Sequence, residues 1–187
     1  MNDTLLLVDD EPDVLTALQR ALFEEPYEIL TAQNAKEALA ILERRPIKVI
    51  VSDERMPGMS GADLLTSVRE RYPQTVRILL TGHASLEATR KAVNSGGIYR
   101  FFTKPWDEAE LLLGLRGAVE KFDLQEENRR LLRTVKRQSQ EFKALEAHYP
   151  GISNVHKDQT GTYLLPELSE SELAELIDRC NREYGEE

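Results

Sequence analysis

Strand-like and helix-like hydrophobic patterns alternate through the first 120 residues of this 187-residue chain, and this alternation constrains the fold most strongly. Short continuous apolar runs predict buried strands, and apolar residues at helical spacing between them predict amphipathic helices. The expected strands cover residues 4–8, 27–32, 49–52, 76–81 and 99–103. The expected helices begin at Pro12, cover residues 35–44, surround residues 64–68, cover residues 86–94 and begin again at Asp107. Five such units in series predict an α/β fold, a doubly wound five-stranded parallel sheet with helices on both faces.

Composition places the chain among globular proteins. Hydrophobic residues make up 41% and charged residues 30%, which suits a chain with a packed core. No apolar run approaches the roughly 20 residues that a membrane span needs, and the N-terminus lacks the basic stretch of a signal peptide. The single cysteine, Cys180, cannot form an internal disulfide, so nothing indicates an oxidising compartment. These features predict a cytoplasmic protein without membrane association.

Polar residues stand where the expected strands end. In a parallel sheet the carboxyl ends of the strands meet at one edge, and ligands bind there. The residues that would reach this edge are Asp9, Asp10, Asp53, Thr81 and Lys104. Three converging carboxylates repel one another, so the site needs a cation, and oxygen ligands favour a hard ion such as Mg²⁺. A metal ion, a lysine and a hydroxyl around one aspartate suit phosphoryl transfer onto a carboxylate, with Asp53 as the nucleophile.

Each of these residues also has an ordinary structural explanation. On its own, Asp9-Asp10-Glu11-Pro12 is more often a helix N-terminus with favourable acidic residues. Asp53 on its own would be a turn residue at the end of a strand, and Thr81 and Lys104 alone carry little meaning. Their occurrence together, each after a successive expected strand, favours the functional interpretation.

Four sequence motifs resemble the receiver domains of two-component response regulators. They are Leu7-Val8-Asp9-Asp10-Glu11, Ser52-Asp53-Glu54-Arg55-Met56-Pro57-Gly58-Met59-Ser60-Gly61, Leu80-Thr81-Gly82-His83 and Phe101-Phe102-Thr103-Lys104-Pro105-Trp106. The resemblance covers roughly residues 3–121. It implies a flavodoxin-like receiver fold with strand order 2-1-3-4-5. It also implies a phosphorelay protein that accepts phosphate on Asp53 from a sensor histidine kinase. Such a protein has no enzyme activity beyond Mg²⁺-dependent self-phosphorylation and autodephosphorylation.

The resemblance further implies a set of metal ligands. Asp10 and Asp53 would bind Mg²⁺ through their side chains. Asp9 would bind the ion through a water molecule, and Arg55 through its backbone carbonyl. The Lys104-Pro105 peptide bond would be cis, as in relatives.

Other positions would take part in switching and in hydrolysis of the phosphorylated aspartate. Thr81 and Lys104 would hold the phosphoryl oxygens, and Thr81 would move toward the phosphate. In the family an aromatic residue on the last strand then turns inward; here it is Phe101, which has no hydroxyl and would act through packing alone. The alternative is that Phe101 is simply a core residue. Arg55 and His83 stand at the two positions that tune hydrolysis, where His83 would act either as a base or as a shield.

A strict heptad pattern follows the expected receiver domain, residues 1–121. The seam residues, spaced alternately by four and three, are Leu124, Asn128, Leu131, Val135, Gln138, Phe142, Leu145 and Tyr149. No proline or glycine interrupts residues 122–149, so the fifth helix is expected to continue through them. We expect a two-stranded homodimeric coiled coil here, and Asn128 favours a parallel pair because a lone buried asparagine often fixes register. The alternative is a helix that folds against a partner protein.

Residues 150–187 are expected to form a small C-terminal element. Residues 152–157 and 162–165 predict a hairpin, and Ser169-Glu170-Ser171-Glu172 predicts the start of a capped helix. One face of that helix would carry Leu173, Leu176, Ile177, Cys180 and Tyr184. Residues 151–187 carry a net charge of −6, which suits a downstream protein partner better than nucleic acid.

The sequence leaves two alternatives to signalling by dimerisation and protein contact. The sequence of residues 96–106 is similar to that of receivers fused to HD-GYP phosphodiesterases. The first alternative is therefore a regulatory receiver subunit of a cyclic-dinucleotide signalling enzyme system. However, no His-Asp pair or Gly-Tyr-Pro motif follows residue 121. A DNA-binding transcriptional regulator would need a basic helix-turn-helix, whereas the tail offers one acidic helix.

Overall fold

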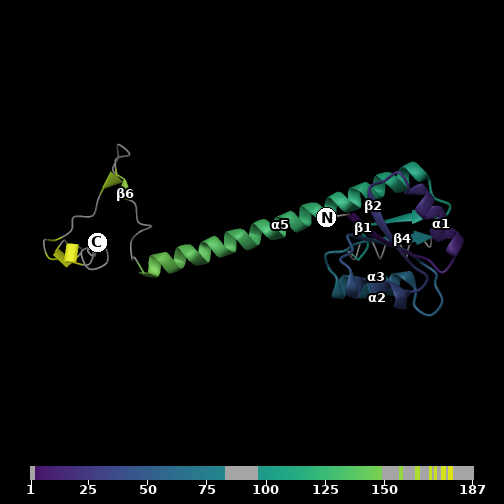
Figure 1. Cartoon of the computed structure of the whole chain (residues 1–187), viewed down its shortest axis with the longest axis horizontal. Coiled ribbons are helices and arrows are strands. Elements are labelled where there is room, and N and C mark those ends of the chain that lie inside the picture. The colour runs from purple at the N-terminus through teal and green to yellow at the C-terminus, as the bar shows by residue number, and fades with distance from the viewer. Residues whose placement is uncertain are drawn as a thin grey trace, which may run out of the picture. The chain divides into compact units, whose positions relative to one another are not determined.

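The computed structural model describes residues 3–82 and 97–148 in full. In the C-terminal segment it describes residues 156, 157, 163, 164, 169, 171, 174, 175, 177 and 178. The chain divides into two units, Met1–Leu132 and Arg133–Glu187. Figure 1 shows the chain and labels most of its helices and several of its strands. Among the described residues, no helix has the length and apolar character that crossing a membrane requires.

The first unit is built on a five-stranded sheet. Its strands are β1 (Asp3–Val8), β2 (Tyr27–Ala32), β3 (Val49–Asp53), β4 (Val76–Thr81) and β5 (Arg100–Thr103). Neighbouring strands all run parallel, in the order β2-β1-β3-β4-β5. This confirms the predicted doubly wound sheet, and each strand begins and ends within one residue of the predicted bounds. The register pairs Asp53 with Leu80 and Thr81 with Thr103, so the carboxyl ends of β3, β4 and β5 lie side by side.

The described helices are α1 (Pro12–Ala21), α2 (Ala35–Arg44), α3 (Gly61–Arg71) and α5 (Glu108–His148). Their starts follow from local sequence. The Asn34 side chain accepts a hydrogen bond from the Glu37 N–H at the start of α2, and Ser60 does the same for α3. Pro12 opens α1, where its missing N–H costs nothing. The helix predicted over residues 86–94 lies outside the described residues.

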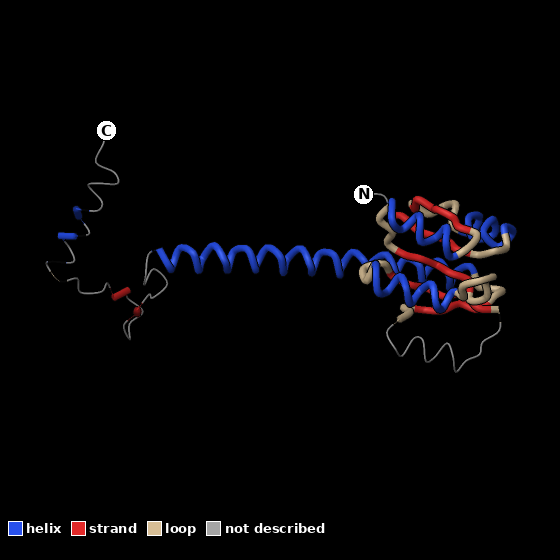
Figure 2. The backbone as a smooth tube through the Cα atoms, turned by 90° about the horizontal axis from the view of Figure 1, so that it is seen from below, coloured by secondary structure: helices blue, strands red, loops and turns tan. Residues whose placement is uncertain are grey.

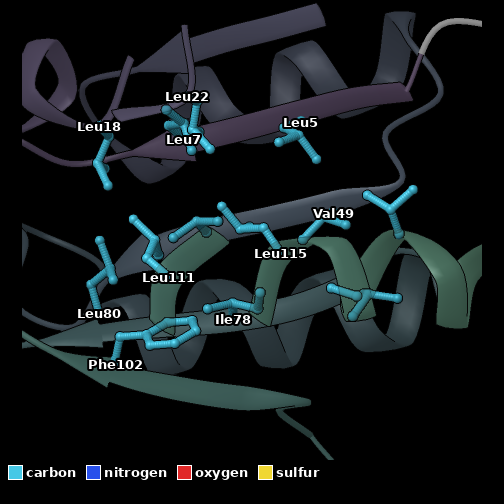
Figure 3. Packing of buried hydrophobic residues seen from close by; sticks show 14 of the residues in the cluster. Leu5, Leu7, Leu18, Leu22, Val49, Ile78, Leu80, Phe102, Leu111 and Leu115 are labelled. Carbon is cyan, nitrogen blue, oxygen red and sulfur yellow. The ribbon is translucent and has the colours of Figure 1, made fainter. Parts of the chain in front are cut away.

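The core consists of two layers, one on each face of the sheet. Alternate residues of β1 point to opposite faces: Leu5 and Leu7 pack against α1 and α5, whereas Leu6 and Val8 pack against α2 and α3. Both faces are covered by helices (Figure 1), which explains why the strands read as continuous apolar runs. Figure 3 shows the first layer, in which the labelled residues are Leu5, Leu7, Leu18, Leu22, Val49, Ile78, Leu80, Phe102, Leu111 and Leu115.

Helix α5 is continuous over 41 residues, which confirms that the fifth helix runs on past the receiver core (Figure 2). Its first turns belong to the core through Leu111, Leu115 and Ala118. Gly114 lies so close to β5 that a Cβ there would stand 2.3 Å from Phe102 Cζ. Farther along, the apolar seam residues of α5 are 49–61% exposed in the single chain; they are Leu124, Leu131, Val135, Phe142 and Leu145.

An ion-pair cluster joins α5 to the amino ends of β1 and β3, at the other end of the strands from the candidate site. Lys48 directly precedes β3, and its Nζ atom lies 2.6 Å from Asp3 Oδ1 and 2.5 Å from Asp123 Oδ1. The same amine stands 5.6 Å from the centre of the Phe122 ring. The start of β1, the start of β3 and the middle of α5 are thereby tied together.

In the second unit the structure describes a short pair of strands and part of a helix. Strands β6 (His156–Lys157) and β7 (Tyr163–Leu164) pair antiparallel, which agrees with the predicted hairpin. The helical residues are Ser171, Ala174, Glu175, Ile177 and Asp178. Of the predicted apolar face, Ile177 is 51% exposed, and the other four members lie outside the described residues.

Candidate functional site

The carboxyl edge of the sheet brings together residues from β1, β3, β4 and β5. Lys104 Nζ, just beyond β5, lies 2.6 Å from Asp9 Oδ2 and 2.5 Å from Asp53 Oδ1. The Lys104 N–H donates to the Thr81 carbonyl at 2.7 Å, which fixes the end of β5 to the end of β4. Asp10 follows Asp9 directly and is half-buried. The residues that the sequence placed at this edge therefore do lie at one place in the fold.

Both carboxylates bonded to Lys104 are held at each of their oxygens. The second oxygen of Asp9, Oδ1, accepts a hydrogen bond from the Glu11 N–H at 3.0 Å. The second oxygen of Asp53, Oδ2, accepts one from the Arg55 N–H at 2.6 Å. One lysine and two backbone N–H groups thus fix the orientation of the two acids, which is the kind of preorganisation that a reactive site needs.

Burial sets the electrostatics of this site. Asp9 has no exposed surface, and Asp53 is 6% exposed. Burial raises the pKa of Asp9, and this effect outweighs the hydrogen bonds from Lys104 and the Glu11 N–H, which lower it. Burial lowers the pKa of Lys104, but the hydrogen bonds to Asp53 and Asp9 outweigh it, so the Lys104 pKa lies above its ordinary value. The lysine is consequently a fixed positive charge at neutral pH.

Two residues of the second motif to which the sequence assigned no role contact the backbone of Asp53. Ser52, fully buried on β3, donates its hydroxyl to the Asp53 carbonyl at 3.0 Å. Gly61, the first residue of α3, approaches the same carbonyl so closely that a Cβ would stand 1.8 Å from its oxygen. The sequence contains one signal for this close approach, which is the glycine directly after the Ser60 cap. Glycine is a poor helix former, so its presence at the start of a helix indicates that a side chain would not fit.

The structure describes all but one of the remaining predicted positions. The Arg55 side chain is exposed, and Thr81 is fully buried at the end of β4. Phe101 is half-buried and packs against the core layer on the α2 and α3 side of the sheet. The Lys104-Pro105 peptide bond is cis, as the resemblance implied. His83 lies outside the described residues.

The chemistry of the edge fits a magnesium ion. Asp9, Asp10 and Asp53 offer only oxygen donors, and the Lys104 ammonium group contacts the two buried acids. Within residues 3–82 and 97–148, no three acidic, histidine or cysteine side chains form a ready-made metal cluster. Mg²⁺ usually needs only one or two carboxylates and keeps several water molecules, so this donor set suits it.

Comparison with known proteins identifies the family. Residues 5–116 match the family described as response regulator receiver domain. The hydrogenase transcriptional regulatory protein HoxA of Cupriavidus necator is 44% identical over 128 residues, which are 68% of this chain and 26% of HoxA. The chain thus spans about a quarter of that relative.

Two solved structures are similar to the receiver. One is the signal receiver domain of an HD domain-containing protein from Pseudomonas fluorescens Pf-5, with 41% identity and a TM-score of 0.64 over 67% of this chain and 93% of that one. The other is described as adenylate cyclase from Rhodopirellula baltica, with 34% identity and a TM-score of 0.68 over 71% of this chain and 98% of that one. With its sheet order and its family match taken together, the chain belongs to the receiver domain family of two-component response regulators.

Proposed function

We propose that Asp53 is the phosphoacceptor of this receiver and takes its phosphoryl group from a sensor histidine kinase, the class of enzyme that phosphorylates response regulators. One observation carries the proposal: the Lys104 amine lies between the carboxylates of Asp9 and Asp53, at 2.6 and 2.5 Å. A carboxylate fixed beside a cation suits phosphoryl transfer, because the transferring group is held by charge and position.

The proposed step is a simple exchange of bonds. A carboxylate oxygen of Asp53 forms a bond to phosphorus while the phosphorus–nitrogen bond of the donor phosphohistidine breaks, and the electron pair stays on the imidazole nitrogen. The Thr81 hydroxyl and the Lys104 ammonium hold the phosphoryl oxygens, because both stand at the same edge of the sheet. Hydrolysis later releases inorganic phosphate and restores the carboxylate.

Magnesium would be held by the acidic residues of this edge. Asp10 and Asp53 would bind it through their side chains, Asp9 through a water molecule, and Arg55 through its backbone carbonyl. When bound, the ion supplies positive charge that neutralises phosphoryl oxygens. Lys104 would add a second positive charge on the other side of Asp53, since its amine contacts Asp53 at 2.5 Å and Asp9 at 2.6 Å.

A small-molecule phosphodonor tests the assignment of Asp53. The chain is incubated with acetyl phosphate and Mg²⁺, and intact mass is measured before peptide mapping. We expect one added phosphoryl group on the wild type and none on Asp53→Asn. The matched control is Asp13→Asn, the same change at an exposed aspartate of α1, which should be phosphorylated like the wild type. A phosphorylated Asp53→Asn protein with the label at another residue would contradict the proposal.

We further propose that the receiver ends near residue 121 and that residues 122–149 pair with a second copy as a coiled coil. The exposed seam supports this, because Leu124, Leu131 and Val135 are each more than half exposed in the single chain and rows of exposed apolar residues mark interfaces. Residues 150–187 would then contact a downstream protein.

The seam can be tested in the full chain by light scattering. Leu131→Glu places a charge in the seam and should convert the dimer to a monomer. Gln140→Glu adds the same charge on the opposite side of the helix and should leave the dimer intact. A dimer that survives Leu131→Glu would place the interface elsewhere.

The two alternative functions receive less support. The family match covers residues 5–116, which is the receiver alone. The transcriptional role in the name of HoxA belongs to that protein, of which this chain spans about a quarter. The receiver from an HD domain-containing protein is likewise similar to this chain only in its receiver fold and sequence.

A further inference from the structure

The backbone carbonyl of Asp53 is enclosed by two neighbours. The Ser52 hydroxyl donates a hydrogen bond to it at 3.0 Å. From the other element, Gly61 comes so close that a Cβ would stand 1.8 Å from the carbonyl oxygen and 2.8 Å from the carbonyl carbon. The same Cβ would stand 2.9 Å from Ser52 Oγ, so the serine hydroxyl and a larger residue at position 61 compete for one space.

Gly61 also closes the loop that follows Asp53. Its N–H donates to the Glu54 carbonyl at 2.9 Å, and the Glu54 N–H donates to the Leu80 carbonyl of β4 at 2.8 Å. Between them Gly58 has a φ of +86°, a left-handed conformation that glycine adopts without strain. The loop is therefore anchored on β4 at one end and on α3 at the other.

This loop also holds one oxygen of the Asp53 carboxylate. Its Oδ2 atom accepts a hydrogen bond from the Arg55 N–H at 2.6 Å, and Arg55 lies within the closed loop. A shift of the Asp53 carbonyl or of the loop would move the carboxylate relative to Lys104, whose Nζ stands 2.5 Å from the other oxygen. Because Ser52 and Asp53 are both buried, a carbonyl that lost its serine donor would have to find a new partner by moving.

We propose that Ser52 and Gly61 are positioning residues for phosphoryl transfer, an inference that rests on the phosphoacceptor role of Asp53. Ser52 holds the Asp53 carbonyl from its own strand, and Gly61 leaves room for that carbonyl at the start of α3. Neither residue touches the phosphodonor. They act by keeping the carboxylate in line for attack, and misplacement of a reacting group by about 1 Å costs roughly a hundredfold in rate.

Ser52→Ala is the main test, because it removes one hydroxyl from a buried site without adding volume. The matched control is Ser67→Ala on α3, where the hydroxyl also donates to a backbone carbonyl, that of Asp63, at 3.1 Å. The full chain is phosphorylated with acetyl phosphate at saturating Mg²⁺, and initial rates are measured across donor concentrations. Thermal unfolding and Mg²⁺ binding by calorimetry are measured on the same preparations.

We expect Ser52→Ala to lower the maximal rate about tenfold, whereas the Mg²⁺ affinity stays within about twofold because every carboxylate is retained. Ser67→Ala should keep the wild-type rate. Ser52→Thr restores the hydroxyl and should recover most of the rate. Gly61→Ala should lower the rate more than Ser52→Ala does. Its melting temperature shows whether this variant is folded. If it is unfolded, the Ser52 variants alone test the positioning role.

The outcomes separate this inference from the function on which it rests. If wild-type chain is not phosphorylated on Asp53, the proposed function fails. If Asp53 is phosphorylated but Ser52→Ala keeps a rate within about twofold of wild type, the phosphoacceptor stands and the positioning role is overturned. Equal losses in Ser52→Ala and Ser67→Ala, or a rate loss without rescue by Ser52→Thr, would also overturn it.

Discussion

Lys104 reaches Asp9, a carboxylate with no exposed surface, at 2.6 Å. The two residues come from opposite ends of the receiver sequence, and their contact closes the carboxyl edge of the sheet between β1 and β5. The lysine simultaneously contacts Asp53 at 2.5 Å. It therefore serves as a common counterion for the proposed phosphoacceptor and for its buried neighbour.

Replacement of Lys104 should make stability depend on magnesium. Lys104→Met leaves Asp9 and Asp53 without their common cation, which should cost about 3–5 kcal/mol because one partner of a largely buried ion pair is removed. Added Mg²⁺ should raise the melting temperature of the variant more than that of the wild type. Circular dichroism melts with and without MgCl₂ measure this, and exposed Lys36→Met is the control. An equal response to Mg²⁺ in both proteins would argue against cation binding by these carboxylates.

Two glycines of α5 should respond differently to alanine. A Cβ at Gly114 would meet Phe102 Cζ at 2.3 Å, so Gly114→Ala should destabilise the receiver by about 1–3 kcal/mol despite its better helix propensity. At Gly117 the nearest atom is Tyr99 Oη at 3.2 Å, at the end of a half-buried side chain that can shift. Gly117→Ala should be neutral or stabilising by up to about 1 kcal/mol. Urea unfolding of both variants tests the contrast, and equal stabilities would refute it.

The ion pair between Glu25 and Arg116 should contribute stability only above acidic pH. Hydrogen bonds from Arg116 lower the pKa of Glu25 below its ordinary value of 4.5. A carboxyl with a lowered pKa in the folded state stabilises the protein above pH 4.5, and the contribution is lost as pH falls through the folded value. Glu25→Gln should therefore cost about 0.5 kcal/mol at pH 7, since Arg116 is largely exposed.

The difference between wild type and Glu25→Gln should disappear in strong acid. Urea unfolding at pH 7 and at a pH well below 4.5 measures it. The neighbouring exposed Glu24→Gln should not show the same pH-dependent loss. A difference that persists unchanged in acid would mean that the pair does not lower the Glu25 pKa.

Asn128 should limit the stability of the proposed coiled coil. It is exposed in the single chain and stands in the seam between Leu124 and Leu131. Asn128→Leu should raise the melting temperature of the dimer, because an apolar residue replaces a polar one in the seam, and it should loosen control of register or oligomer number. Thermal melts and light scattering at several concentrations check both effects. A lower melting temperature would place Asn128 outside the interface.

Arg55 and His83 should set the lifetime of the phosphorylated aspartate. Arg55 lies two residues after Asp53 with an exposed side chain, where it can influence access of water. We expect Arg55→Ala and His83→Ala each to change the decay rate severalfold. The decay is followed by intact mass after removal of phosphodonor. Wild-type decay in both variants would show that neither residue tunes hydrolysis.

Sequence could predict the sheet because burial on both faces leaves a direct trace in residue type. Leu5 to Val8 form a continuous apolar run since α1 and α5 cover one side of β1 and α2 and α3 cover the other. The site could be predicted for a related reason. In a parallel sheet the ends of successive strands meet, so Asp9 and Lys104 could be brought together without knowledge of any side-chain contact.

Contacts that depend on how neighbouring elements pack could not be predicted in this way. Position 61 needs glycine because α3 begins so close to the Asp53 carbonyl that a Cβ would not fit there. The contact of Lys48 with Asp123 joins residues 75 positions apart. A hydrophobic pattern predicts neither the Gly61 contact nor the Lys48 contact. Both depend on how the elements pack against each other, which the pattern of apolar residues does not specify.

The continuity of α5 restricts how its sequence can change in length. Leu111 and Leu115 fix the rotation of the helix in the core, and the first seam residues, Leu124 to Leu131 in the same unit, share that rotation because the helix is unbroken between them. Each residue inserted between the core segment and Leu124 would turn the seam by about 100°, so a single insertion would aim it in a new direction. An insertion of seven residues would restore the original direction to within about 20°. Lineages that lengthen or exchange the sequence beyond the receiver should therefore do so in steps of whole heptads.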